Sequence, residues 1–131
     1  MKTIKKVLVI DDEDDLRKLI QTCLELTAGW RVTTASSGQE GLAKAQTDPP
    51  DIILIDVMMP GMDGLTLLQH LRADASTQQI PVILLTAKGR SSTPDPFAQW
   101  NIQGTIRKPF KPLTLAEQIT SVLSQSSDFT P

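Results

Sequence analysis

Short apolar runs alternate along this chain with longer segments in which apolar residues recur at helical spacing. A continuous apolar run of about four to eight residues between turn signals is typical of a strand buried on both faces. Five segments are predicted as strands, of which the first, third and fourth follow this pattern: Lys6–Ile10, Arg31–Ala35, Ile52–Ile55, Val82–Leu85 and Thr105–Arg107. The second of them is short and largely polar, which indicates a strand at the edge of a sheet.

Amphipathic helices are expected between these strands. After Asp14, apolar residues recur at the i, i+3, i+4 and i+7 positions of one helix face, until a glycine ends the pattern. Ser36 or Ser37 can cap a second helix, with Gln39 or Glu40 completing a capping box. Further helices are expected at about Gly64–Ala73, Phe97–Trp100 and Leu115–Leu123.

This alternation predicts an α/β fold in which helices cover both faces of a parallel sheet. Residues 87–96 are expected to be irregular, because Gly89, Pro94 and Pro96 fall within them and proline is tolerated only in a first helical turn, so the fourth helix, around Phe97–Trp100, is expected to be short. The 131 residues suffice for one ordinary domain. We place it at residues 1–125, followed by a polar C-terminal tail at residues 126–131.

Polar functional groups stand at the carboxyl ends of four predicted strands. They are Asp11 and Asp12 after the first strand, Asp56 after the third, Thr86 after the fourth and Lys108 after the fifth. Right-handed crossovers bring the carboxyl ends of parallel strands to one edge, where open α/β sheets bind their ligands. We therefore expect these five side chains to lie together.

The chemistry of this group points to phosphate. Three carboxylates in one pocket repel one another, so they would share protons or need a cation. Oxygen ligands without histidine or thiolate favour a hard ion, and Mg²⁺ fits best, although Mn²⁺ would suit the same ligands. Lys108 adds a mobile ammonium suited to phosphate, and Thr86 adds a hydroxyl donor. Together they predict phosphoryl transfer onto a carboxylate, with Asp56 as the nucleophile.

With these residues in this order, the chain resembles the receiver domain of two-component response regulators. The matching motifs are Asp11-Asp12, Asp56, Pro60-Gly61 with Asp63-Gly64, Thr86-Ala87 and Lys108-Pro109-Phe110, within a match from about Lys5 to Leu123. Each motif alone is weak, but the full set at these intervals is specific. The resemblance implies a flavodoxin-like, doubly wound five-stranded parallel sheet of order 2-1-3-4-5 with five helices. It also suggests a stand-alone receiver of the chemotaxis-regulator type.

The resemblance implies a phosphorelay role for the site. Asp56 would accept the phosphoryl group from a phosphohistidine on a sensor histidine kinase or a histidine phosphotransfer protein. Thr86 would move toward the phosphoryl oxygen, Lys108 would bridge carboxylate and phosphate, and the backbone of Met58 and Ala87 would contact the phosphate. The domain would not be an enzyme beyond catalysing its own phosphorylation and slow dephosphorylation. Phosphorylation would switch a surface that binds a downstream protein.

The resemblance also implies a metal site. Asp12, Asp56 and the backbone carbonyl of Met58 would bind Mg²⁺ directly, while Asp11 would act largely through water.

Two departures from the family pattern carry expectations of their own. Thr105 stands where family members usually carry tyrosine or phenylalanine, so we expect the partner-binding surface beside it to be altered. Met58 and Lys88 offer no obvious group to position a water for attack, so we expect a long-lived aspartyl phosphate.

Composition narrows the partners and the compartment. Thirteen basic against fifteen acidic residues give a net charge of −2, which provides no electrostatic case for nucleic acid or anionic lipid. The single cysteine, Cys23, excludes an intrachain disulfide and fits a reducing compartment. No apolar stretch approaches the ~20 residues of a membrane span. We expect a cytoplasmic protein that binds neither membranes nor, by itself, nucleic acid; a homodimer is compatible with the sequence.

Three other functions share parts of this pattern. A haloacid-dehalogenase-type phosphatase also uses a strand-end aspartate and Mg²⁺, but it needs a second acid where this chain has Met58. A flavin-binding module would meet repulsion between its phosphate and the acidic run Asp11–Asp15. A receiver-like interaction module that is not regulated by phosphorylation would not need the full set of site residues.

Several polar residues fit structural roles instead. Asp63-Gly64 is interpreted as a turn and helix cap, and Asp14 with Asp15 as the acidic first turn of a helix. His70 is expected on the surface, and Cys23 on a buried helix face.

Overall fold

The computed structural model describes residues 4–57, 62–86 and 102–124. In chain order the elements are β1 (Lys6–Ile10), α1 (Asp14–Ala28), β2 (Arg31–Ala35), α2 (Gly38–Thr47), β3 (Ile52–Asp56), α3 (Gly64–Ala73), β4 (Val82–Thr86), β5 (Gly104–Arg107), the 3₁₀ turn η2 (Pro112–Thr114) and α4 (Leu115–Ser124). The strands form a parallel sheet of order β2-β1-β3-β4-β5, which is the flavodoxin-like arrangement. The predicted fold class is confirmed.

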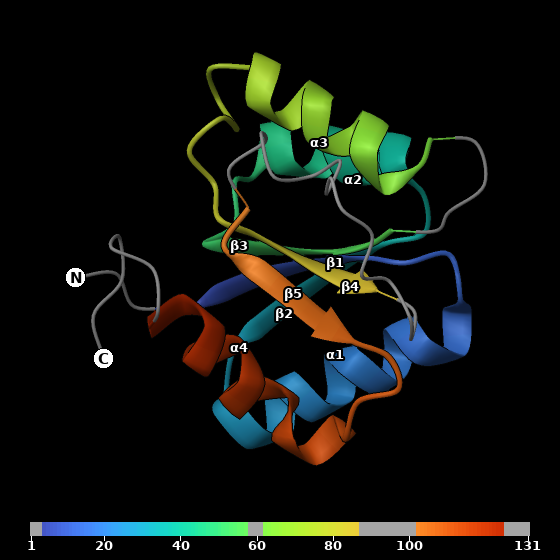
Figure 1. Ribbon diagram of the computed structural model, residues 1–131, viewed down its shortest axis with the longest axis vertical. Coiled ribbons are helices and arrows are strands. Elements are labelled where there is room, and N and C mark those ends of the chain that lie inside the picture. The colour runs from blue at the N-terminus through green and yellow to red at the C-terminus, as the bar shows by residue number, and fades with distance from the viewer. Residues whose placement is uncertain (1–3, 58–61, 87–101, 125–131) are drawn as a thin grey trace.

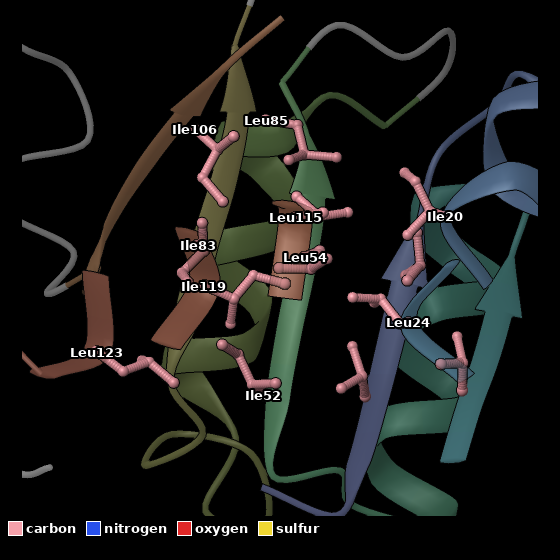
Figure 2. Packing of buried hydrophobic residues seen from close by; sticks show 13 residues of the cluster. Ile20, Leu24, Ile52, Leu54, Ile83, Leu85, Ile106, Leu115, Ile119 and Leu123 are labelled. Carbon is pink, nitrogen blue, oxygen red and sulfur yellow. The ribbon is translucent and has the colours of Figure 1, made fainter. Parts of the chain in front are cut away.

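Helices cover both faces of this sheet, α1 and α4 on one side and α2 and α3 on the other (Figure 1). Each side has its own apolar layer. The layer under α1 and α4 includes Ile20, Leu24, Leu115, Ile119 and Leu123, which point toward the sheet in Figure 2. The layer under α2 and α3 includes Ala45, Leu67, Leu68 and Leu71.

The central strands β3 and β4 are buried along their whole length. Their successive side chains enter opposite layers: Ile52 and Leu54 belong to the layer of α1 and α4, and Ile53 and Ile55 to the other. Because both faces are apolar, these strands show continuous apolar runs in the sequence and no alternation.

The register aligns the carboxyl ends of the strands. The last pairs are Ile10 with Ile55, Asp56 with Leu85, and Thr86 with Arg107. Residues that follow these pairs therefore leave the sheet at one edge.

Local sequence signals set several helix ends. Gly29 follows α1 in the left-handed region, with φ of 70°, a conformation that glycine adopts without steric cost. The side chains of Ser37 and Asp63 cap α2 and α3 by accepting hydrogen bonds from the backbone N–H groups of Glu40 and Thr66. The capping roles predicted for Ser37 and Asp63 are confirmed.

The structure differs from the prediction mainly at strand ends. β3 and β4 extend one residue further, through Asp56 and Thr86, and β5 begins one residue earlier, at Gly104. Backbone pairing continues regardless of side-chain polarity, which explains the difference. The shortened helix predicted around Phe97–Trp100 lies outside the described residues.

Among the described helices, none combines the length and apolar character needed to cross a membrane.

Candidate functional site

Three carboxylates converge at the carboxyl edge of the sheet. Asp11 and Asp12 follow β1, and Asp56 is the last residue of β3. One oxygen from each lies within 4.8 Å of the others. The sequence prediction that these three acids meet is therefore correct.

Asp11 is the most buried of the three, with no exposed surface. Its Oδ1 accepts a hydrogen bond of 2.8 Å from the backbone N–H of Glu13. Its Oδ2 is buried and accepts no hydrogen bond from the residues that the structure describes, and its ion pair with Lys108 Nζ is long at 3.5 Å. A buried carboxylate oxygen with so little compensation is costly, which makes it a natural ligand for a cation.

Lys108 reaches this group from the end of β5. Its backbone N–H donates to the carbonyl oxygen of Thr86 at 2.7 Å, so the strand pairing carries the residue to the site. Its Nζ lies 3.2 Å from Asp56 Oδ1, and the peptide bond to Pro109 is cis. Burial alone would lower the pKa of the Lys108 ammonium, but the negative charges of Asp11 and Asp56 outweigh it and raise that pKa above its usual value.

Asp56 and Thr86 end the two central strands and are each 5% exposed. The strand pairing places Leu85 beside Asp56, so Thr86 stands one residue further toward the open edge. The N–H of Val57 continues this pairing by donating to the carbonyl oxygen of Leu85 at 3.2 Å. The carboxylate and the hydroxyl are thus carried by neighbouring rigid strands.

The start of α3 packs closely under the chain that leaves β3. The N–H of Gly64 donates to the carbonyl oxygen of Val57 at 3.1 Å. A Cβ at position 64 would lie 3.0 Å from Val57 Cα, a distance that real Cβ atoms rarely show. Gly64 therefore permits the close approach, while Asp63 caps the helix, in agreement with the structural interpretation of this motif.

Arg17 is a site neighbour that sequence reasoning did not single out. Its Nη1 donates to the backbone carbonyl oxygen of Asp11 at 2.8 Å, and its Nη2 pairs with Asp14. The only sequence signal is an arginine one turn into the helix that follows the acidic pair, which is common on helix surfaces.

Of the remaining residues singled out in the sequence, two lie outside the described residues and two are placed by the structure. Met58 and Ala87, whose backbones were predicted to contact phosphate or metal, lie outside the described residues. His70 is exposed and Cys23 is buried, as predicted.

A shallow apolar hollow of about 430 Å³ adjoins the site. It lies between the first turns of α1 and the segment after β5, and its lining is Glu13, Leu16, Leu19, Lys108, Pro109, Phe110 and Pro112. Lys108 thus belongs both to the carboxylate cluster and to the rim of this hollow.

Comparison with known proteins agrees with this geometry. A family model described as the response regulator receiver domain matches residues 7–120. The alkaline phosphatase synthesis transcriptional regulatory protein PhoP of Bacillus subtilis is 35% identical over 127 residues, which is 97% of this chain and 52% of that protein. The response regulator PleD of Caulobacter vibrioides is 48% identical over 83 residues, which is 63% of this chain and 18% of that protein. The chain spans about half the length of several such regulators.

Solved structures show the same relationship. The chemotaxis response regulator CheY4 of Vibrio cholerae superposes with a TM-score of 0.83 at 34% identity, and the match covers 92% of this chain and 100% of the CheY4 chain. A putative response regulator from Chloroflexus aurantiacus gives a TM-score of 0.82 at 30% identity, covering 93% and 99% of the two chains. In fold, motif order and sequence, this chain belongs to the response regulator receiver domain family of two-component signalling.

Proposed function

We propose that this chain is a phosphoacceptor in a two-component phosphorelay, with Asp56 as the residue that receives the phosphoryl group. The observation that carries the proposal is the position of Asp56: it ends a central strand at the open edge, 3.2 Å from the Lys108 ammonium and within 4.8 Å of two further carboxylates. The donor would be a phosphohistidine of a sensor histidine kinase or of a histidine phosphotransfer protein.

The proposed transfer needs little from the protein beyond position and charge. A carboxylate oxygen of Asp56 attacks phosphorus, the new P–O bond forms, and the P–N bond to the donor imidazole breaks. The Lys108 ammonium stabilises charge on the transferred group. Thr86 supplies a hydroxyl that can donate to a phosphoryl oxygen from the neighbouring strand. Hydrolysis of the product would reset the domain.

We assign Asp11, Asp12 and Asp56 to a divalent cation, Mg²⁺ or Mn²⁺, with the backbone carbonyl of Met58 as a further ligand. The donor set fits a hard ion, because the described ligands are all carboxylate oxygens. The buried, poorly compensated Oδ2 of Asp11 fits as well. When bound, the ion supplies neutralisation of charge on phosphate oxygens.

The phosphodonor protein would cover the apolar hollow beside Lys108. The donor histidine must come within bonding distance of Asp56. The surface of the donor protein around that histidine must therefore contact residues next to the site. Leu16, Leu19 and Phe110 line the adjoining hollow and offer apolar contact area for such a partner.

The output of the domain would be a protein contact that changes on phosphorylation. The described helices and strands carry the phosphoacceptor site, and we retain residues 1–125 as the receiver domain and 126–131 as a tail. Thr105, which replaces the usual aromatic residue, is exposed on β5. We propose that its surface contacts a downstream protein, that the domain works in the cytoplasm, and that its own chemistry is confined to gaining and losing the phosphoryl group.

Two competing functions are less well supported. A phosphatase of the haloacid-dehalogenase type would need an acid at position 58, where this chain has methionine. An interaction module without phosphorylation would not require the full set of Asp11, Asp56 and Lys108, which this chain brings together.

Incubation with acetyl phosphate and Mg²⁺, followed by mass spectrometry of the intact chain, tests the proposal. We expect one phosphoryl group on the wild type and none on Asp56→Asn, while Asp63→Asn, which alters a capping carboxylate, is phosphorylated like the wild type. An unmodified wild type, or a phosphorylated Asp56→Asn variant, would refute the assignment.

A further inference from the structure

Arg17 holds the backbone that joins the two acidic residues after β1. Its side chain is 14% exposed, although it lies on the first turns of a surface helix. Nη1 donates to the carbonyl oxygen of Asp11 at 2.8 Å, and that oxygen belongs to the peptide group linking Asp11 to Asp12. Nη2 pairs with Asp14, so the planar guanidinium is anchored on two sides.

The same short segment is held at its other polar atoms. The N–H of Asp11 donates to the carbonyl oxygen of Ala35 at 3.1 Å, and Asp11 Oδ1 accepts from Glu13 N at 2.8 Å. The N–H of Arg17 in turn donates to the carbonyl oxygen of Glu13 at 2.9 Å. Arg17 therefore ties the peptide between the two acids to the first turn of α1.

This contact acts on the backbone that carries Asp12. Asp11 is fully buried and its side chain is fixed locally, whereas Asp12 is exposed. An exposed side chain takes its direction largely from the backbone that carries it. The orientation of the Asp11–Asp12 peptide group thus sets the separation of the two carboxylates.

Arg17 also carries a positive charge, which is paired with Asp14 outside the carboxylate cluster. Three carboxylates within 4.8 Å repel one another strongly before any cation binds. Lys108 offsets part of this repulsion, but its ammonium is also needed for phosphate. The guanidinium is permanently charged, and its charge alone would weaken the binding of a divalent cation, so the inference rests on the geometry of its hydrogen bond to the Asp11 carbonyl.

We propose that Arg17 is a positioning residue for the acidic site, which presets Asp11 and Asp12 for a divalent cation without touching it. This inference rests on the function proposed above, in which these carboxylates hold Mg²⁺.

Calorimetric titration of the full chain with MgCl₂, without any phosphodonor, tests the inference. Residues that orient metal ligands typically change metal affinity by about 10- to 100-fold. We expect Arg17→Met to bind Mg²⁺ at least about tenfold more weakly than the wild type. Arg17→Lys keeps the charge but lacks the two-sided donor geometry, and it should also bind more weakly than the wild type. Lys18→Met removes an exposed charge from the same helix and should leave the affinity unchanged.

A second measurement separates positioning from general stability. Amide chemical shifts of Asp12 and Glu13 should change in metal-free Arg17→Met, and urea unfolding reports the stability of each variant. If Arg17→Met only lowers the urea midpoint while its Mg²⁺ affinity equals that of the wild type, the inference is wrong. If Arg17→Met does not fold, Arg17→Lys decides, and wild-type affinity in that variant overturns the inference. If the wild type itself binds no Mg²⁺, the metal assignment fails and the inference falls with it.

Discussion

Lys108 serves as an internal cation for the acidic site. Its Nζ lies 3.2 Å from Asp56 Oδ1 and 3.5 Å from Asp11 Oδ2. Burial lowers the pKa of the ammonium, but the negative charges of Asp11 and Asp56 raise it by more, so the net pKa is above its usual value. The Lys108 side chain is 22% exposed, so solvent screens its ion pairs less than those of exposed lysines, and removing it would leave buried carboxylates without a counter-charge. In the proposed function, the Lys108 ammonium offsets the repulsion between these carboxylates until phosphate arrives.

Removing that cation should destabilise the metal-free domain. We expect Lys108→Met to lower the free energy of unfolding by about 2 kcal/mol without Mg²⁺, because Asp11 and Asp56 then repel each other without a counter-charge. Added Mg²⁺ should raise the urea midpoint of this variant more than that of the wild type. Lys111→Met, which alters an exposed lysine nearby, provides the control. Equal midpoints for Lys108→Met and the wild type in EDTA would contradict this role.

At the scale of single elements, the start of α2 is held by a charged cap. Glu40 Oε1 accepts hydrogen bonds from the backbone N–H and the hydroxyl of Ser36, and Ser37 Oγ accepts from Glu40 N. The backbone hydrogen bond from Ser36 is the largest cause that lowers the pKa of Glu40 from 4.5 to about 2, followed by the Ser36 hydroxyl and Lys44. The sequence predicted a capping box here, and the carboxylate in fact reaches one residue further back.

This cap predicts a pH dependence. Because the folded-state pKa of Glu40 is depressed, its stabilising effect is present above pH 4.5 and is lost as the pH falls toward about 2. Glu40→Gln should therefore be less stable than the wild type at pH 7, and the difference in urea midpoint should shrink between pH 4.5 and 2. A difference that stays constant down to pH 2 would argue against the cap. Glu25→Gln, at an exposed position of α1, serves as the comparison.

The sequence predicted those strands and helix ends that depend on the local preferences of a few residues. The apolar runs of β3 and β4 predict strands buried on both faces, and Gly29, Ser37 and Asp63 predict helix ends, because their conformational and hydrogen-bonding preferences act locally. Element boundaries were less accurate, since Asp56 and Thr86 resemble turn residues although their backbones still pair.

The details of the site depend on contacts between distant parts of the chain. That Asp11, Asp56 and Lys108 share one edge follows from the parallel topology, which the sequence predicted. The hydrogen bond from Arg17 to the Asp11 carbonyl oxygen depends on the side-chain conformation of Arg17 and on the direction in which the chain runs from β1 into α1. Asp11 Oδ2 is buried and has no hydrogen-bond donor among the described residues, and no local sequence pattern predicts this.

At the scale of the whole molecule, the site lies next to a surface suited to a protein partner. Leu19 is 43% exposed at the hollow beside Lys108, while Leu26, further along α1, is 81% exposed. In the proposed function, a phosphorylated donor protein would contact this surface, whereas a small donor such as acetyl phosphate would not need it. The two donors therefore distinguish partner docking from the chemistry at Asp56.

The donor is a histidine phosphotransfer protein that phosphorylates the wild type. We expect Leu19→Asp to slow phosphotransfer from this donor by about tenfold, as loss of one well-placed apolar contact would. Phosphorylation by acetyl phosphate should be unchanged. Leu26→Asp, which introduces the same charge elsewhere on α1, should behave like the wild type with both donors. Equal slowing with acetyl phosphate would show that Leu19 supports the site itself and not the docking of a partner.

Location of the phosphoryl group tests the central claim most directly. Sodium borohydride reduces an aspartyl phosphate to homoserine, so treatment of the phosphorylated chain followed by peptide mass spectrometry identifies the modified residue. The account predicts homoserine at position 56 and at no other aspartate. Modification at Asp11, Asp12 or His70, or a phosphoryl group that borohydride does not convert, would contradict it.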